Sequence, residues 1–218
     1  LRSFDIILVT CLDNFLKVKS FNLPGTLYEI SNGTNYPEKI RINKGNNLLM
    51  VGNYEYSGNL EGIDWFLKSV WPKLKVKINL KLVLVGKYSD KLKQIVKDDS
   101  RIDLTGLVDK LDSYYENACC VILPLFNDGG TKTKLIEAMA FGVPIVSTSI
   151  GAKGFESTNT ISISDHPKEF FELIENIFTD NYPINSLIKS RKMIKNNYTW
   201  DGIGNQLNNL ISTINANT

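Results

Sequence analysis

The sequence predicts an α/β fold whose sheet is parallel and doubly wound. Short β-rich runs alternate with segments of helical spacing over about 130 residues, which implies strands joined by crossover helices. Several of these runs are continuously apolar over four to six residues. Such runs are typical of strands that are covered on both faces. The two observations together favour a layered domain with helices on either side of the sheet.

The strands are predicted in two groups that a polar stretch separates. Phe4–Thr10 and Thr26–Ser31 come first, and Asn32–Asn47 follows with Asn-Gly, Tyr-Pro and Lys-Gly turn chemistry. The second group is NLLMVGN, KLVLVG, RIDLTG, CCVILPL, PIVSTS and TISIS. Helical spacing is found at residues 61–74, 88–97, 108–118, 132–141, 167–178, 184–195 and 202–214.

The polar stretch divides the chain into two parts. Residues 1–43 are predicted to be the tail end of a preceding domain, a strand–helix–strand piece, together with a linker. Residues 44–218 are predicted to be one domain with closing C-terminal helices. The chain begins Leu-Arg-Ser-Phe, without an initiator methionine and directly before an apolar strand. We therefore expect it to be part of a longer, two-domain protein.

Composition excludes several classes. Lys+Arg 25 against Asp+Glu 23 argues against a nucleic-acid or membrane-surface binder. No apolar stretch approaches the roughly 20 residues that span a bilayer. His166 is the only histidine, so a His-rich metal site and a histidine triad within this chain are excluded. Cys11, Cys119 and Cys120 have no CxxC spacing and are expected to be reduced, as in a cytoplasmic protein. Adjacent Cys119 and Cys120 are expected on opposite faces of a strand.

The stretch Leu123–Phe155 carries the strongest functional signal. A strand ends at Pro124, a loop follows, and then a helix begins. Ligands of open parallel sheets bind at the carboxyl ends of the strands. Paired glycines let backbone N–H groups approach an anion, and the helix N-terminus adds a partial positive charge. The loop holds Asp128, Gly129, Gly130 and Thr131.

Two lysines follow the loop. Lys132 and Lys134 fall in the first helical turn, where each cation opposes the helix dipole by about 0.3–1 kcal/mol. Two unfavourably placed cations within three residues favour a bound anion at this helix N-terminus. A diphosphate is the natural candidate. The alternative is that both lysines are solvated surface groups.

Glu137 lies one turn further along the same helix. Helical spacing puts Leu135, Ala138 and Met139 on the buried face and Glu137 on the other side. Its carboxylate can accept two hydrogen bonds from vicinal hydroxyls, such as those of a ribose. The alternative is an ordinary surface pair with Lys134. The loop is not a Walker A motif, and no strand ends in GxGxxG.

The residues Gly129–Val146, GGTKTKLIEAMAFGVPIV, resemble the carboxyl-terminal domain of GT-B-type retaining glycosyltransferases, the glycosyl transferases group 1 (family 4) set. The shared pattern is a Gly-rich loop, a basic residue and Glu-Ala-Met-Ala-x-Gly-x-Pro. Elements in the same order as in the family are Tyr28–Gly33, Val51–Asn53, Leu84–Gly86, Thr105–Asp109, Ser147–Gly154 and Tyr198–Trp200. The resemblance implies a Rossmann-like domain that forms one half of a GT-B fold.

The resemblance also implies a role for each matching residue. Glu137 would hold the donor ribose and, with Lys132, forms the expected catalytic pair. The residues expected to bind the nucleotide-diphosphate part of the donor are Gly52, Asn53, Gly106, Val108, Asp128, Gly129, Gly130, Thr131 and Lys134. Of these, Gly106 and Val108 would flank the base.

The implied reaction is transfer of a sugar from a nucleotide-diphosphate donor, a UDP-sugar or GDP-sugar, with retention. Polysaccharide or glycoconjugate synthesis is the implied setting. Catalysis would depend on electrostatic stabilisation of the departing diphosphate, without a metal and without a cofactor besides the donor. The preceding acceptor domain would be needed for activity, and any peripheral membrane contact would be made through it.

The sequence departs from the family pattern at three positions. Gly129 stands where many members have a second acidic residue, and Asn53 and Asn59 stand where many have an Arg and a Lys that clamp the diphosphate. We expect Lys132 and Lys134 to substitute for these cations. Two other functions remain open: a non-catalytic interaction module that keeps the fold, and a GT-B-type sugar-nucleotide epimerase.

Overall fold

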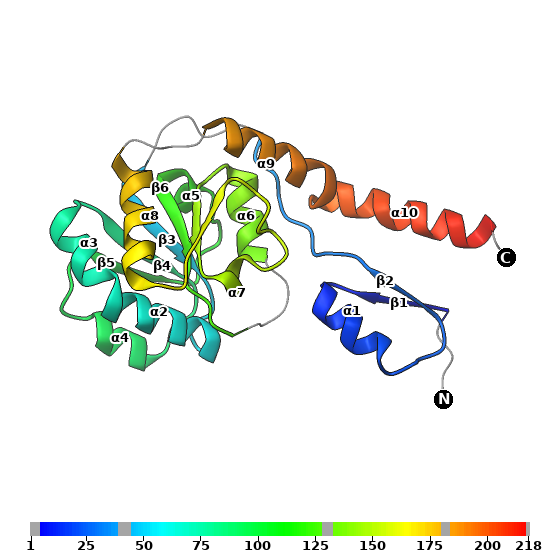
Figure 1. Ribbon diagram of the computed structural model, residues 1–218, viewed down its shortest axis with the longest axis horizontal. Coiled ribbons are helices and arrows are strands. Elements are labelled where there is room, and N and C mark those ends of the chain that lie inside the picture. The colour runs from blue at the N-terminus through cyan, green and yellow to red at the C-terminus, as the bar shows by residue number, and fades with distance from the viewer. Residues whose placement is uncertain (1–4, 39–44, 128–132, 180–183, 217–218) are drawn as a thin grey trace.

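A computed structural model describes residues 5–38, 45–127, 133–179 and 184–216. Its main body is a six-stranded sheet in the order β5-β4-β3-β6-β7-β8, and every neighbouring pair in it is parallel (Figure 1). Within this sheet, the chain starts near the middle at β3 and passes through β4 to the edge strand β5. It then returns to β6, beside β3, and continues through β7 to the other edge strand, β8. This is the predicted parallel, doubly wound α/β fold, which is therefore confirmed.

The strands and helices of this body agree with the predicted order. The strands are β3 (Asn47–Val51), β4 (Lys81–Val85), β5 (Ile102–Gly106), β6 (Ala118–Leu123), β7 (Ile145–Ser147) and β8 (Ile161–Ile163). The helices are α2 (Ser57–Ser69), α3 (Trp71–Lys77), α4 (Asp90–Val96), α5 (Asp112–Asn117), α6 (Thr133–Phe141), α7 (Ser149–Ala152), α8 (Pro167–Thr179), α9 (Ile184–Asn197) and α10 (Trp200–Ala216).

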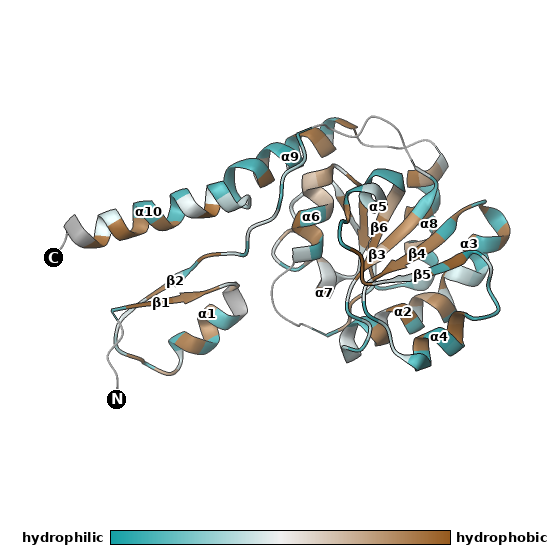
Figure 2. Cartoon of the chain, turned by 180° about the vertical axis from the view of Figure 1, so that it is seen from behind, coloured by the Kyte–Doolittle hydropathy of each residue, from teal (hydrophilic) through white to brown (hydrophobic). Residues whose placement is uncertain are grey.

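The sheet is buried on both faces. Along β3, Leu48 and Met50 enter one core cluster and Leu49 enters the other, because successive side chains of a strand point to opposite faces. Helices α2, α3, α4 and α8 contribute to the first cluster, and α5, α6 and α9 to the second. Figure 2 shows the resulting apolar strands between amphipathic helices. Burial on both faces explains why these strands are continuous apolar runs rather than alternating patterns.

The expected placement of the two adjacent cysteines is wrong. Cys119 and Cys120 are both fully buried in the same core cluster. The ladder between β3 and β6 shifts register here, with Asn47 opposite Ala118 and Leu48 opposite Cys120. Cys119 is therefore the extra residue of a β-bulge, which interrupts the alternation of side chains.

Two helices differ from the predicted pattern. The segment 61–74 was expected as one helix, but α2 ends at Ser69 and α3 begins at Trp71. Pro72 occupies the first turn of α3, where its missing N–H needs no partner, and it cannot continue α2. The short helix α7 was not predicted. It is capped by Thr148, whose hydroxyl oxygen accepts a hydrogen bond from the Gly151 N–H at 3.3 Å.

A buried arginine of α9 links this helix to α6 and to the segment that precedes β3. Arg191 of α9 is 5% exposed. Its guanidinium donates to the carbonyl oxygens of Ala140 in α6 and Pro37, the latter at 2.6 Å, and lies 4.3 Å from the centre of the Tyr36 ring. The segment at Tyr36 and Pro37 is thereby held against α9 and the last turn of α6.

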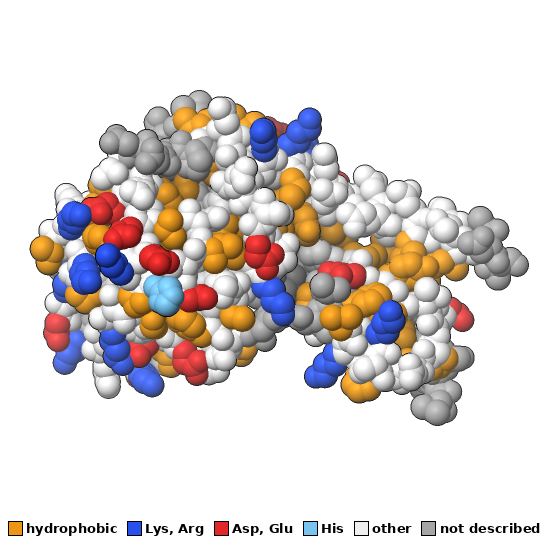
Figure 3. All heavy atoms as spheres, in the orientation of Figure 1, with side chains coloured by type: hydrophobic (Ala, Val, Ile, Leu, Met, Phe, Trp, Pro, Cys, Tyr) orange, Lys and Arg blue, Asp and Glu red, His pale blue; other side chains and the backbone are white. Residues whose placement is uncertain are grey.

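Residues 5–29 form a separate small unit. Strands β1 (Ile6–Val9) and β2 (Thr26–Glu29) pair in parallel with α1 (Leu12–Lys19) between them, set apart from the main sheet in Figure 1. Hydrophobic side chains are visible on the surface of this unit in Figure 3. Leu8, Leu16, Phe21 and Leu23 are each more than 40% exposed.

Among the helices that the structure describes, none is long and apolar enough to cross a membrane.

Replacing Arg191 with Met should lower the free energy of unfolding by about 1–3 kcal/mol, because the buried carbonyl oxygen of Ala140 and the partly buried one of Pro37 lose their donor. Urea denaturation followed by circular dichroism measures this change. Lys189→Met removes a positive charge from an exposed position of the same helix and serves as the control. Equal stability of the two variants would contradict the proposed role of Arg191.

The three thiols should differ in reactivity. Cys119 and Cys120 are buried, and burial raises the pKa of the Cys120 thiol well above its usual value, whereas Cys11 is partly exposed. Because the thiolate is the reactive form, a thiol reagent at pH 8 should rapidly modify one cysteine of the native chain and three in urea. Cys11→Ser should abolish the rapid phase. Rapid modification of any thiol in the folded Cys11→Ser variant would refute this assignment.

Candidate functional site

The described residues of the predicted site lie at the carboxyl edge of the main sheet. Gly52 and Asn53 directly follow β3, Gly106 is the last residue of β5, and Val108 comes two positions later. Lys134 and Glu137 project from α6, which follows β6. The carboxyl ends of parallel strands meet at one edge, so the predicted residues are brought together. The other predicted residues, Asp128, Gly129, Gly130, Thr131 and Lys132, lie outside the described residues.

Helix α6 carries Lys134 and Glu137, the two charged residues of the predicted site that the structure describes. Its apolar side chains Leu135, Ile136, Ala138 and Met139 are buried, so the helix is held firmly against the sheet. Gly142 ends it with a φ of +70°. The N–H groups of Gly142 and Val143 donate to the carbonyl oxygens of Met139 and Ala138, which is a Schellman motif. Lys134 and Glu137 are each partly buried at the margin of this helix.

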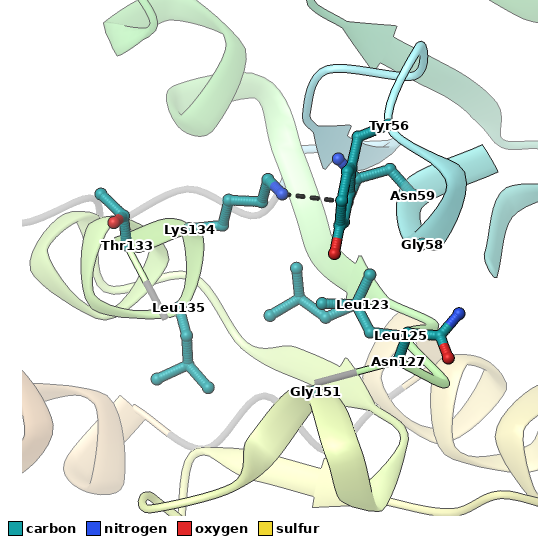
Figure 4. A pocket seen from close by; sticks show the side chains of 10 residues that line it. All are labelled: Tyr56, Gly58, Asn59, Leu123, Leu125, Asn127, Thr133, Lys134, Leu135 and Gly151. Atoms are coloured by element: carbon teal, nitrogen blue, oxygen red, sulfur yellow. Dashed lines mark hydrogen bonds between the residues drawn. The ribbon is translucent and has the colours of Figure 1, made fainter. Parts of the chain in front are cut away.

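Lys134 is held by an asparagine of α2. The Lys134 Nζ donates to the Asn59 Oδ1 at 3.0 Å (Figure 4). The Asn59 Nδ2 in turn donates to the Asn53 carbonyl oxygen at 2.8 Å. Asn59 is 5% exposed. A Cβ on Gly52 would lie 3.3 Å from the Lys134 Cε, closer than ordinary contact, so glycine leaves room for the lysine. The ammonium group is thereby fixed beside the end of β3.

The same lysine borders a pocket between α2, α6 and α7. In Figure 4, Lys134 reaches across from α6 toward Asn59 and Tyr56. The pocket combines polar groups with apolar walls and is lined by Tyr56, Gly58, Asn59, Leu123, Leu125, Asn127, Thr133, Lys134, Leu135 and Gly151. Small-molecule sites commonly have such a lining, in which a few polar groups orient the ligand.

Glu137 is held by a tyrosine of α5. The Tyr115 hydroxyl donates to the Glu137 Oε2 at 3.1 Å, and the Tyr115 ring stacks on Phe141 with centroids 4.6 Å apart. Burial raises the pKa of the Glu137 carboxyl above its usual value, while the hydrogen bond from Tyr115 and the charge of Lys134 act in the opposite direction. One oxygen of the Glu137 carboxylate is therefore held by Tyr115. The Glu137 side chain also borders a hollow.

The hollow beside Glu137 has a volume of about 570 Å³, within the range of small-molecule sites. Helices α5 and α6 form two walls, and the segment held by Arg191 forms a third. It is lined by Thr34, Asn35, Tyr36, Pro37, Val108, Asp109, Lys110, Leu111, Asp112, Tyr115, Glu137 and Phe141.

A mostly apolar slot adjoins the hollow at the ends of β3, β4 and β5. Val108 and Leu111 line both, so the two are neighbours. Gly106 has a φ of +74°, which turns the chain from β5 toward the slot. Gly86 has a φ of +124°, and a Cβ there would lie 2.0 Å from the Gly52 carbonyl oxygen. The slot is lined by Val51, Gly52, Asn53, Val85, Gly86, Lys87, Leu107, Val108 and Leu111.

Two contacts bear on the interpretations that the sequence left open for Lys134 and Glu137. Lys134 is bonded to Asn59 on α2 and is therefore not simply a solvated surface lysine. Glu137 is bonded to Tyr115 on α5 and is partly buried, which a wet surface pair with Lys134 would not be. Both residues are held by partners that are distant in sequence.

Sequence reasoning missed two residues of this site. Asn59 was interpreted only as the loss of a basic residue, whereas it accepts the hydrogen bond that positions Lys134. Tyr115 was not identified, because a tyrosine in an amphipathic helix has the same pattern as any core aromatic. For Asn59, the signal in the sequence was an asparagine without another explanation near the start of a helix. Within the described part of the chain, no three His, Cys, Asp or Glu side chains gather as a metal site would require.

Curated proteins and solved structures resemble the chain in sequence and in fold. A 44.6 kDa protein in the cps region of Klebsiella pneumoniae is 34% identical over 117 residues, 50% of this chain and 30% of that protein. A glycosyltransferase of Haemophilus influenzae is 36% identical over 94 residues, 40% of this chain and 26% of that protein. S. aureus TarM, crystallised with UDP, shares the fold with a TM-score of 0.72 at 18% identity, over 95% of this chain and 44% of TarM.

The chain therefore spans less than half the length of each of these proteins. Residues 45–180 match the family described as glycosyl transferases group 1. This region is more than half of the chain and contains the six strands, α6 and the two side-chain pairs that hold Lys134 and Glu137. On this match, the chain belongs to the glycosyl transferases group 1 family.

Proposed function

We propose that the chain is the donor-binding part of a glycosyltransferase that moves a sugar from a nucleotide-diphosphate donor to an acceptor, with retention. The observation that carries this proposal is α6, which presents a held ammonium and a held carboxylate one turn apart at the carboxyl edge of a parallel sheet. A diphosphate and a ribose are adjacent groups of one nucleotide, and these two side chains are complementary to them.

The diphosphate would lie beside Lys134. No acidic residue occupies the first turn of α6, so the partial positive charge of the helix N-terminus adds to that of the ammonium. In a transfer reaction, negative charge builds on the departing diphosphate, and a cation fixed in advance stabilises it most in the transition state. Lys132, Gly130 and Thr131 remain proposed partners of the same group, together with Asp128 and Gly129. The proposal needs neither a metal nor a further cofactor.

The nucleoside would occupy the hollow and the slot. One oxygen of Glu137 is bonded to Tyr115, and the other acceptor positions of the carboxylate are suited to ribose hydroxyls. The apolar slot beyond Val108 has the character of a surface against which a flat base packs. Gly52 and Asn53 line it, and Gly106 directly precedes Leu107 of its lining. TarM was crystallised with UDP, which supports a nucleotide as the ligand class here.

The domain assignment remains part of the proposal. We propose that residues 1–43 belong to a preceding acceptor-side domain with its linker, and residues 44–218 to the donor domain. The separate pairing of β1 with β2 and the exposed Leu8, Leu16 and Phe21 support this division. The chain by itself is then expected to bind donor but to turn over little or not at all. The cps location of the Klebsiella relative supports a role in polysaccharide synthesis, and three free cysteines support the cytoplasm.

Lys134→Met should weaken binding of UDP or GDP by about 10–100-fold, because a charge-assisted hydrogen bond to the diphosphate is lost. The corresponding nucleosides, which lack phosphate, should bind both forms equally. Isothermal titration with UDP, GDP, ADP and their nucleosides measures this. Lys168→Met, at an exposed position of α8, is the matched control. Failure of every nucleotide to bind the unaltered chain would overturn the proposed function.

Glu137→Gln should weaken UDP or GDP by about 10-fold while leaving the 2′,3′-dideoxy analogues unaffected, because the neutral amide accepts ribose hydroxyls less well. The unaltered chain should also lose affinity on acidification, since Glu137 has a raised pKa and is protonated at a higher pH than an ordinary glutamate. The Gln variant lacks this titration and corrects for protonation of the diphosphate itself. Equal weakening of ribo and dideoxy nucleotides would argue against ribose binding.

A further inference from the structure

We infer that Tyr115 is a positioning residue for the nucleotide ribose, because its hydroxyl group holds the Glu137 carboxylate in the orientation that faces the hollow. The inference rests on the proposed function, in which Glu137 binds the ribose. It assigns a role to a residue of α5 that neither composition nor helical spacing distinguishes from an ordinary core aromatic.

The position of Tyr115 suits it to hold the Glu137 carboxylate. The Tyr115 side chain is fully buried and lies in the core cluster beneath α6. Its ring is nearly parallel to that of Phe141, at an interplanar angle of 14° and a centroid distance of 4.6 Å. Phe141 is the last residue of α6 and Glu137 lies one turn before it. The stack therefore aligns the hydroxyl with Glu137, and the Oε2 lies 3.1 Å away.

The hydrogen bond changes what Glu137 presents to a ligand. A glutamate has three side-chain torsions, and ordering them when a ligand binds costs conformational entropy. With one oxygen anchored in advance, that ordering is already complete. The Tyr115 hydroxyl stays protonated and therefore remains a hydrogen-bond donor, because burial raises the pKa of Tyr115 well above its usual value. The same bond favours the ionised form of Glu137 and so opposes the effect of burial on its pKa.

Other charged groups near Glu137 lie on α6, at the start of α5 and on α9. Lys134 lies on the same helix and lowers the pKa of the carboxyl. Asp109, Lys110 and Asp112 line the hollow at the start of α5. On the opposite side, Arg191 of α9 is bonded to the carbonyl oxygens of Ala140 and Pro37. Tyr115 is the side chain of α5 whose hydrogen bond reaches the carboxylate.

Tyr115→Phe tests the inference because it removes the hydroxyl and keeps the ring that stacks on Phe141. UDP affinity should fall about 5–10-fold, the loss expected for one ordinary hydrogen bond. The 2′,3′-dideoxy analogue should bind with unchanged affinity. In a Glu137→Gln background the same substitution should cost little more, since the two residues act through one contact. Tyr114→Phe removes a hydroxyl at the neighbouring position of α5 and is the matched control.

A measurement without nucleotide separates this inference from the proposed function. Carbon-13 NMR of the Glu137 carboxyl, assigned with Glu137→Gln, should show a higher pKa in Tyr115→Phe than in the unaltered chain or in Tyr114→Phe. An unaltered chain that binds no nucleotide overturns the proposed function and with it the ribose role. An unaltered chain that binds UDP, with Tyr115→Phe equal to it in affinity and in the Glu137 titration, overturns the role of Tyr115 and leaves the proposed function intact.

Discussion

Parallel pairing of six strands, buried on both faces, is the constraint on which the rest of this structure depends. Parallel neighbours need a crossover after every strand, so each strand is followed by a loop at the same edge of the sheet. The residues that follow β3, β5 and β6 are therefore near one another, although more than 80 positions separate Gly52 from Glu137. Glycines permit the close approach, since a Cβ on Gly86 would overlap the Gly52 carbonyl oxygen.

The charges of the site depend on a second layer of contacts. Lys134 stands where a cation opposes the helix dipole, and Asn59 and the space beside Gly52 keep it there. Glu137 stands in a partly buried position, and Tyr115 stabilises its ionised form. In each case an unfavourable electrostatic placement is retained by a partner from another helix. Such placements are typical of binding sites, where an anion or a polar ligand completes the interaction.

The departures from the sequence-based expectations have local physical causes. Asn59 was counted as a missing cation, because a sequence shows which residue is absent but not which neighbour replaces it. The bulge at Cys119 placed two adjacent cysteines in one core cluster, since register depends on the partner strand and not on β6 itself. Helix α2 ended before Pro72 because a proline is accommodated in a first turn more readily than in a helix interior.

Several features were determined by the sequence alone. Continuous apolar runs between amphipathic segments specified the sheet and its helices, because burial on both faces leaves strands no polar side. The Gly-rich loop and the EAMAFGVP segment indicated the glycosyltransferase family, and helical spacing separated Glu137 from the buried face of α6. The tertiary structure decided which groups hold the side chains of Lys134 and Glu137. Asn59 and Tyr115 meet Lys134 and Glu137 across 75 and 22 positions of the chain, and such contacts follow from packing, which local propensity does not encode.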